Sequence, residues 1–221
     1  HPMNFGFQKF VGFKSGNVDY QSHRNRYGDV DWWDGLEMKN MPGYTTTLLT
    51  TLSEDYIKEN KDKPFCLYIA HAAPHSPMQG PNEKAIRTEA TLEGDKNSDR
   101  PNKEIYKDMV EELDWSVGRI LETLKKYKLD KNTFVVFFSD NGPVINNGGS
   151  TGGYRGAKGA PWEGGHRVPG ICYMPGTVKG GTMCKQTVMS FDLFPTMLDM
   201  ANIHYDDSKK KLDGASLVPL F

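Results

Sequence analysis

The stretch Thr133-Phe-Val-Val-Phe-Phe-Ser-Asp-Asn-Gly-Pro143 carries the strongest structural signal in this chain. Its apolar run fits a buried strand, and the run ends abruptly in the polar pair Asp140 and Asn141. Open α/β sheets place their ligand sites at the carboxyl ends of their strands. A carboxylate and an amide oxygen at such an edge suit a divalent cation. The sequence therefore predicts a cation site directly after this strand.

A tight turn is the alternative interpretation, because Asn-Gly is a common two-residue hairpin turn. A hairpin needs an alternating strand directly after the turn, whereas residues 144–153 are rich in Asn and Gly. We therefore expect the strand to end without pairing back at once. A later Gly-rich loop, Gly156-Ala-Lys-Gly159, places Lys158 where the backbone can approach a ligand closely. The alternative for Lys158 is an ordinary exposed lysine.

A histidine follows the second buried-strand candidate, residues 65–70, in the segment Ala70-His-Ala-Ala-Pro-His-Ser-Pro77. The spacing of His71 and His75 could suggest a metal site, but Pro74 and Pro77 exclude the helix that would make it useful. A lone loop histidine is more often a surface or packing residue. The position of His75 after a strand nevertheless makes it a candidate for the same sheet edge.

The order of elements predicts an α/β fold with a largely parallel central sheet flanked by helices. Apolar residues at 3–4 spacing predict helices over 45–60 and 103–128, and a third helix follows Ser190. Short apolar runs predict strands over 65–70, 134–138 and 170–174. Residues 1–44 are expected to form irregular, aromatic-rich loop with short strands, and residues 71–101 a polar loop. No repeat or linker interrupts the chain, so we expect one domain.

The bulk composition excludes some function classes. With 27 basic and 28 acidic residues among 221, the net charge of −1 gives no strong field to favour nucleic acid or a membrane surface. No apolar run approaches the roughly 20 residues of a transmembrane helix, so no membrane span is expected. Cys66, Cys172 and Cys184 are odd in number and are predicted to be packed thiols, not a disulfide framework or zinc site.

Three motifs together closely resemble the type I sulfatase family, the arylsulfatase-like branch of the alkaline-phosphatase superfamily. They are Asp140-Asn-Gly-Pro143, Gly156-Ala-Lys-Gly159 and Glu163-Gly-Gly-His-Arg-Val-Pro169. The resemblance implies that Asp140 and Asn141 are metal ligands, usually for Ca²⁺, with Mg²⁺ as the alternative.

The same resemblance assigns the residues that touch the substrate. It implies that His75 contacts the sulfate group and that Lys158 binds a sulfate oxygen, so both are candidate catalytic and substrate-binding residues. His71 is given a supporting or structural role. Glu163, His166 and Arg167 are expected to be buried charges that organise the Lys158 loop.

The resemblance covers essentially all of residues 1–221, but only part of the family's active site. The family's nucleophile is a formylglycine made from the cysteine of a Cys-x-Pro/Ala-x-Arg motif, and none of the three cysteines has that context. In the family, this motif precedes a segment like His1-Pro-Met-Asn-Phe-Gly-Phe7, and Asp213-Gly-Ala-Ser-Leu-Val-Pro-Leu220 resembles the close of the main domain. We therefore expect a single partial sulfatase catalytic domain without its N-terminal strands and C-terminal subdomain.

The expected activity of the parent protein is that of a sulfuric ester hydrolase, acting on a sulfated carbohydrate or an aryl sulfate. The aromatic N-terminal segment favours a sugar, with Trp32 and Trp33 as a candidate binding wall. The 221-residue chain alone is expected to be inactive and to depend on the remainder of the same polypeptide. The family resemblance implies a periplasmic, secreted or lysosomal location.

Three alternatives stay open. One is a phosphoryl or phosphonate ester hydrolase of the same superfamily, which the residue at the nucleophile position would distinguish. Another is a non-catalytic module that binds sulfated glycan through Lys158, His75 and the aromatic loops. The last is a fragment with no function of its own.

Overall fold

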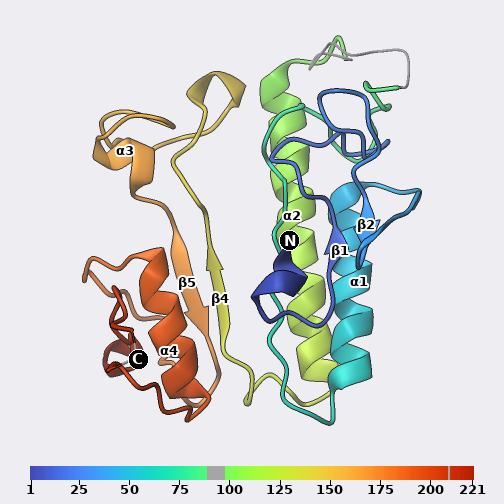
Figure 1. Ribbon diagram of the computed structural model, residues 1–221. Helices are drawn as coiled ribbons and strands as arrows, with labels where there is room; N and C mark the ends of the chain where they lie inside the picture. Colours follow the sequence, from blue (N-terminus) through green and yellow to red (C-terminus); the bar gives the residue numbers. More distant parts are fainter. Residues whose placement is uncertain (89–97, 209) are drawn as a thin grey trace. The chain divides into compact units, whose positions relative to one another are not determined.

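The computed structural model describes residues 1–88, 98–208 and 210–221 (Figure 1). The chain divides into two compact units. The first unit consists of His1–Tyr127 and Asp140–Val168, and the second of Lys128–Ser139 and Pro169–Phe221. Residues 89–97 of the predicted polar loop lie outside the described residues.

Two long helices form the body of the first unit. Helix α1 (Thr45–Asn60) packs against helix α2 (Asn102–Lys126), and both agree with the predicted helices to within two residues at each end (Figure 1). The predicted apolar stripe of α2 faces inward at four of its positions: Ile105, Met109, Ile120 and Leu124 are buried. A salt bridge also joins the helices: Arg119 Nη2 of α2 lies 2.9 Å from Glu54 Oε1 of α1. None of the described helices is long and apolar enough to cross a bilayer.

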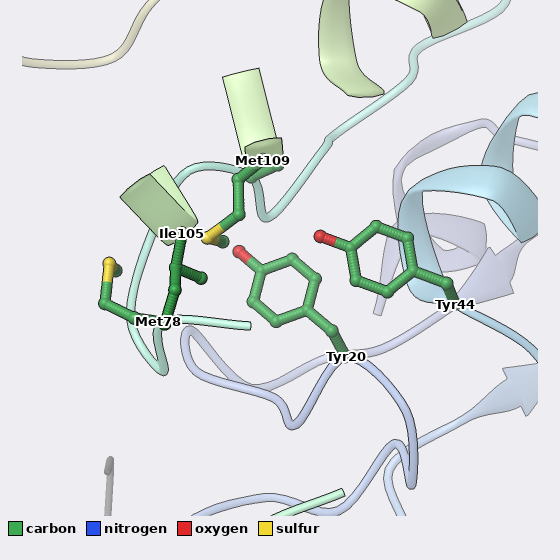
Figure 2. Close-up of a cluster of buried hydrophobic side chains, with 6 residues drawn as sticks. Tyr20, Tyr44, Met78, Ile105 and Met109 are labelled. Atoms are coloured by element: carbon green, nitrogen blue, oxygen red, sulfur yellow. The ribbon is translucent and has the colours of Figure 1, made fainter. Parts of the chain in front are cut away.

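A buried cluster joins four segments of the first unit (Figure 2). Its members come from the N-terminal segment, the residue before α1, the loop around His75 and the first turns of α2. They are Tyr20, Tyr44, Ala73, Met78, Ile105 and Met109. The rings of Tyr20 and Tyr44 stack with their centroids 5.5 Å apart. The loop that carries His75 is therefore packed directly on α2.

The N-terminal segment agrees with the prediction of irregular loop with short strands. A 3-10 helix η1 (Pro2–Phe5) is followed by a small antiparallel sheet of β1 (Val11–Gly12), β2 (Trp33–Asp34) and β3 (Glu37–Met38). Trp32 is 0% exposed. Trp32 is therefore excluded from the expected sugar-binding wall of Trp32 and Trp33, because its ring belongs to the core, whereas Trp33 is half-buried.

The second unit contains the predicted strands on either side of the Gly-rich loop. Strand β4 (Val135–Phe138) pairs antiparallel with β5 (Gly170–Tyr173), in a register that sets Val135 opposite Tyr173. The remaining elements are short helices: η3 (Ser190–Asp192), α4 (Leu193–Met200) and η4 (Val218–Leu220). The helix expected after Ser190 is thus present as η3 and α4.

The predicted largely parallel sheet is not found among the described residues, where every strand pairing is antiparallel. Residues 65–70 have no ladder partner in this part of the chain, although their exposure alternates as in a strand. Phe65, Leu67 and Ile69 are half-buried, while Cys66, Tyr68 and Ala70 are exposed. A single extended segment can alternate in exposure by itself, whereas pairing needs a second strand.

The cysteine prediction is correct only in part. All three cysteines are free thiols, but Cys66 and Cys184 are exposed instead of packed. The apolar neighbours of Cys66 suggested burial on both faces, yet in the described structure only the Leu67 side of that segment is covered.

Gly118, in the middle of α2, gives a stability prediction. It is exposed, has ordinary helical backbone, and a methyl group there would meet nothing within 4 Å. Gly118→Ala should therefore raise the free energy of unfolding by about 1 kcal/mol, because alanine loses less backbone entropy in a helix. Urea unfolding of the complete protein measures this. Gly152→Ala is the control, since Gly152 is equally unobstructed but has a φ of +64°; a gain there, or none at Gly118, would contradict the argument.

Candidate functional site

The polar pair that was predicted to end a strand follows β4 after one residue, Ser139. Asp140 is exposed, and Asn141 is half-buried with its Nδ2 donating to the carbonyl oxygen of Gly142 at 2.9 Å. This bond engages the amide nitrogen of Asn141. The chain then continues into the 3-10 helix η2 (Ile145–Asn147), and β5 starts only at Gly170. The tight-hairpin alternative is therefore wrong.

The Lys158 loop is bonded to this polar turn through the backbone. The amide of Gly142 donates to the carbonyl of Gly165 at 2.8 Å, and the amide of Lys158 donates to the carbonyl of Pro143 at 3.0 Å. Gly165 lies in the short helix α3 (Glu163–His166). The Asp140 turn and the Lys158 loop were predicted independently to carry site residues. They are held together by one hydrogen bond at Gly142 and one at Pro143.

Three glycines make this close approach sterically possible. A methyl group on Gly142 would overlap the carbonyl oxygen of Gly164, and one on Gly165 would overlap that of Ala160. A methyl group on Gly164 would overlap the carbonyl oxygen of Gly156. In the sequence these glycines stand only as parts of motifs. Their packing role depends on contacts between segments, which the sequence alone does not show.

Charged and aromatic side chains line the outside of the same loop. The guanidinium carbon of Arg155 lies 3.8 Å from the ring centroid of Trp162, and that of Arg167 lies 4.5 Å from the ring of Tyr154. Arg167 also pairs with Glu163 at 3.0 Å.

The prediction that Glu163, His166 and Arg167 are buried charges is wrong, because all three are exposed. Glu163 and Arg167 are four residues apart, so they meet along the outer face of α3.

His75 is exposed, and its surroundings determine which ring nitrogen is available. Its Nδ1 lies 2.9 Å from the carbonyl oxygen of Ser76, so we assign the proton to Nδ1 and leave Nε2 for a ligand. Its backbone amide donates to the carbonyl of Ala72 at 2.8 Å. Its own carbonyl accepts from the hydroxyl of Tyr20 at 2.9 Å.

The first turns of α2 contact both parts of the candidate site. On one side, Ile105 and Met109 pack in the buried cluster with Ala73 and Met78, which flank His75 in the chain. On the other, η2 packs on α2, and Asn102 Nδ2 lies 3.4 Å from Asn147 Oδ1. The His75 loop and the segment after Asp140 therefore share one helical support.

The oxygen donors fit a hard cation only in part. The Asp140 carboxylate and the Asn141 amide oxygen are suitable ligands, but Ca²⁺ takes about six to eight oxygens. Within the described residues, no group of three or more His, Cys, Asp or Glu side chains could hold a metal ion. These two residues would by themselves make only part of a cation site, and further ligands would be needed.

His71 has a defined environment that the sequence did not reveal. Its Nε2 lies 3.3 Å from Ser116 Oγ, which in turn lies 2.6 Å from Thr50 Oγ1. Its Nδ1 is buried and has no hydrogen-bond partner among the described residues. Burial lowers the pKa of His71 to about 4. His71 is therefore a neutral residue that bonds to α2, in agreement with the structural role expected for it.

This burial predicts a pH dependence of stability. An unfolded histidine has a pKa of about 6.5, so between about pH 6.5 and pH 4 the unfolded chain binds a proton that folded His71 does not. Stability should therefore fall as the pH is lowered through this window, by up to about 3 kcal/mol from this group. Urea unfolding of wild type and His71→Gln at several pH values isolates the contribution. Identical pH slopes for the two proteins would contradict it.

Comparison with known proteins agrees with the motifs. The chain matches the family model described as Sulfatase over residues 2–203. It is 34% identical over 183 residues to steryl-sulfatase of Rattus norvegicus, covering 79% of this chain and 29% of that protein. It is 32% identical over 236 residues to N-acetylgalactosamine-6-sulfatase of Canis lupus familiaris, covering 99% of this chain and 42% of that protein.

A solved structure resembles the whole chain. The crystal structure of Ps i-CgsB in complex with k-i-k-neocarrahexaose matches with a TM-score of 0.84 and 28% identity, over 100% of this chain and 51% of that one. The chain spans less than half the length of the two curated relatives above. These matches agree with the predicted α/β class and with the resemblance carried by the motifs. This chain belongs to the sulfatase family.

Proposed function

We propose that the protein containing this chain is a sulfuric ester hydrolase, which converts R–O–SO₃⁻ and water to R–OH and hydrogen sulfate. The observation that carries the proposal is the backbone junction between the Asp140–Asn141 turn and the Lys158 loop. It holds two oxygen donors and a cationic side chain on segments that are bonded to each other. Such fixed charges stabilise an anionic transition state without reorganisation during the reaction.

The roles of the substrate-binding residues follow from their chemistry. Lys158 is exposed, so its ammonium group is available to neutralise charge on the sulfuryl oxygens. When Nε2 of His75 carries a proton, it donates a hydrogen bond to a sulfate oxygen or gives that proton to the leaving oxygen.

Two further components belong to the proposed mechanism. Asp140 and Asn141 would hold a calcium ion, with magnesium as the alternative. When bound, the cation would polarise sulfate oxygens, and a formylglycine outside this chain would supply the attacking oxygen. The role of the chain itself in this mechanism is to bind and orient the sulfate group through Lys158 and His75.

A sulfated sugar is the proposed substrate. The relative named N-acetylgalactosamine-6-sulfatase, 32% identical to this chain, supports it, as does the neocarrahexaose complex of the structure at 28% identity. Since Trp32 is buried, this proposal does not rely on the aromatic wall expected from the sequence.

We also propose that residues 1–221 are part of one larger catalytic domain with a parallel sheet. The support comes from residues 65–70, whose alternating exposure is that of a strand but which have no ladder partner in the described part of the chain. The relatives have additional sequence outside the matched region, which would supply neighbouring strands.

The test is direct. The complete protein is assayed with calcium on an aryl sulfate, a 6-sulfated N-acetylgalactosamine and the matching phosphate esters, and released sulfate and phosphate are measured. We expect sulfate release to predominate. Preference for phosphate would support a phosphoryl hydrolase, and sugar binding without turnover a glycan-binding module; either result contradicts the proposal. The 221-residue chain, assayed alongside, should be inactive, because its residues supply no activated nucleophile.

A further inference from the structure

Tyr20 connects the N-terminal segment to the backbone of His75. Its side chain is 0% exposed, and its hydroxyl donates to the carbonyl oxygen of His75 at 2.9 Å. In Figure 2 the ring lies beside that of Tyr44, with both hydroxyl groups inside the cluster. Burial raises the pKa of the Tyr20 hydroxyl well above its usual value, so the hydroxyl is protonated and donates at neutral pH.

The backbone of Tyr20 is fixed as firmly as its side chain. Its amide donates to Gln79 Oε1 at 2.9 Å, and its carbonyl accepts from the amide of Thr45 at 2.8 Å. Gln79 is itself fully buried and donates through Nε2 to the carbonyl of Lys84 at 2.9 Å. The backbone of Tyr20 is therefore held by the N-terminus of α1 and by the loop beyond His75.

This anchoring limits the positions that the His75 ring can take. The His75 amide is bonded to Ala72 and its carbonyl to Tyr20, while its ring Nδ1 is near the carbonyl of Ser76. With both peptide groups and one ring nitrogen restrained, the direction of Nε2 is determined by the backbone. A group held in this way loses little entropy when it meets a ligand.

We propose that Tyr20 is a positioning residue for His75, which it orients through the His75 carbonyl so that Nε2 faces the sulfate group. Tyr20 does not touch substrate. The proposal rests on the proposed function for the role of His75, but the bond that it invokes exists independently of that role.

Tyr44 provides a matched control. It is also buried, it stacks on Tyr20, and its hydroxyl donates to a backbone carbonyl in the same loop, that of Gln79, at 2.7 Å. Tyr20→Phe and Tyr44→Phe each remove one oxygen atom and one hydrogen bond to a backbone carbonyl, so similar losses of stability are expected. Only the first removes a bond to His75.

The first test needs no enzymatic activity. Histidine-ring NMR of the complete protein reports each imidazole, and the His75 signal is assigned by its loss in His75→Gln. We expect Tyr20→Phe to shift or broaden the His75 signal and Tyr44→Phe to leave it in place, at similar melting temperatures. An unmoved His75 signal in Tyr20→Phe, or equal changes in both variants, would overturn the proposal.

The second test is a double-mutant cycle on sulfate ester hydrolysis. Tyr20→Phe should lower kcat about tenfold or more, since a misplacement of about 1 Å can cost 10²-fold, whereas Tyr44→Phe should stay within about twofold. In a His75→Ala background the effect of Tyr20→Phe should disappear, because its partner is gone. An equal loss in both backgrounds would show that Tyr20 only stabilises the fold. If the wild type shows no hydrolysis, the proposed function fails, while the NMR result still decides the positioning role.

Discussion

Lys158→Ala should lower kcat for sulfate ester hydrolysis by ~10²–10³ in the complete protein, while the bound metal is retained. The backbone of the loop is held by its amide bond to Pro143 and by the glycine contacts, so removing the side chain leaves the loop in place. What is lost is one preorganised positive charge at the sulfuryl group. Steady-state kinetics and metal analysis together measure this.

Lys107→Ala is the control for Lys158→Ala. Lys107 is an exposed lysine on α2 that pairs only with Glu111, at 3.3 Å, among the salt bridges found in the described structure. Its removal should leave kcat within about twofold of wild type, because an exposed pair contributes little. Near-normal turnover in Lys158→Ala would show that the assigned role is wrong.

Asp140→Ala should give a different signature, in which metal content and turnover fall together. The carboxylate supplies negative charge that the amide of Asn141 cannot replace, so the cation loses both a ligand and charge balance. Metal content and turnover of Asp140→Asn should lie between those of wild type and Asp140→Ala, since asparagine keeps an oxygen and loses the charge. Full metal content in Asp140→Ala would exclude Asp140 as a ligand.

Gly165→Ala is expected to lower the free energy of unfolding by about 2–3 kcal/mol. The added methyl group would overlap the carbonyl oxygen of Ala160, and a backbone atom cannot move away by changing rotamer. Separation of the Lys158 loop from the Asp140 turn should lower turnover as well. Thermal unfolding and limited proteolysis within residues 150–168 would detect both effects.

Gly16→Ala serves as the control for Gly165→Ala. A methyl group on Gly16 would meet nothing within 4 Å. If the two variants unfold alike, the close packing around Gly165 does not matter for stability.

The helices could be predicted from sequence because their signal is local. Apolar residues at 3–4 spacing over 45–60 and 103–128 are enough to define α1 and α2 to within two residues. The sheets could not be predicted in this way. Residues 65–70 have the composition of a strand, but a strand also needs a neighbour, and none lies within the described residues.

The sequence suggested candidate site residues where a motif carried the chemistry and not where packing did. Asp140, Asn141, His75 and Lys158 were assigned from motifs that resemble those of sulfatases, and their roles stay predictions. Tyr20 was not, because its role depends on a bond to a residue 55 positions away. An aromatic side chain has no local mark that separates core from surface, and Trp32 was misassigned for that reason.

The hydrogen bonds at Gly142 and Pro143 also determine how freely the sequence at the tip of the Lys158 loop can vary. Because backbone atoms fasten the base of the loop at Pro143, Arg155 and Gly165, the exposed turn around Gly152 and Gly153 is not needed to keep Lys158 in place. Residues can be inserted or exchanged at that tip without moving the fastened base. The backbone that carries Lys158 and the neighbouring surface are thus independent of each other, so the exposed tip can be redesigned while Lys158 stays where it is.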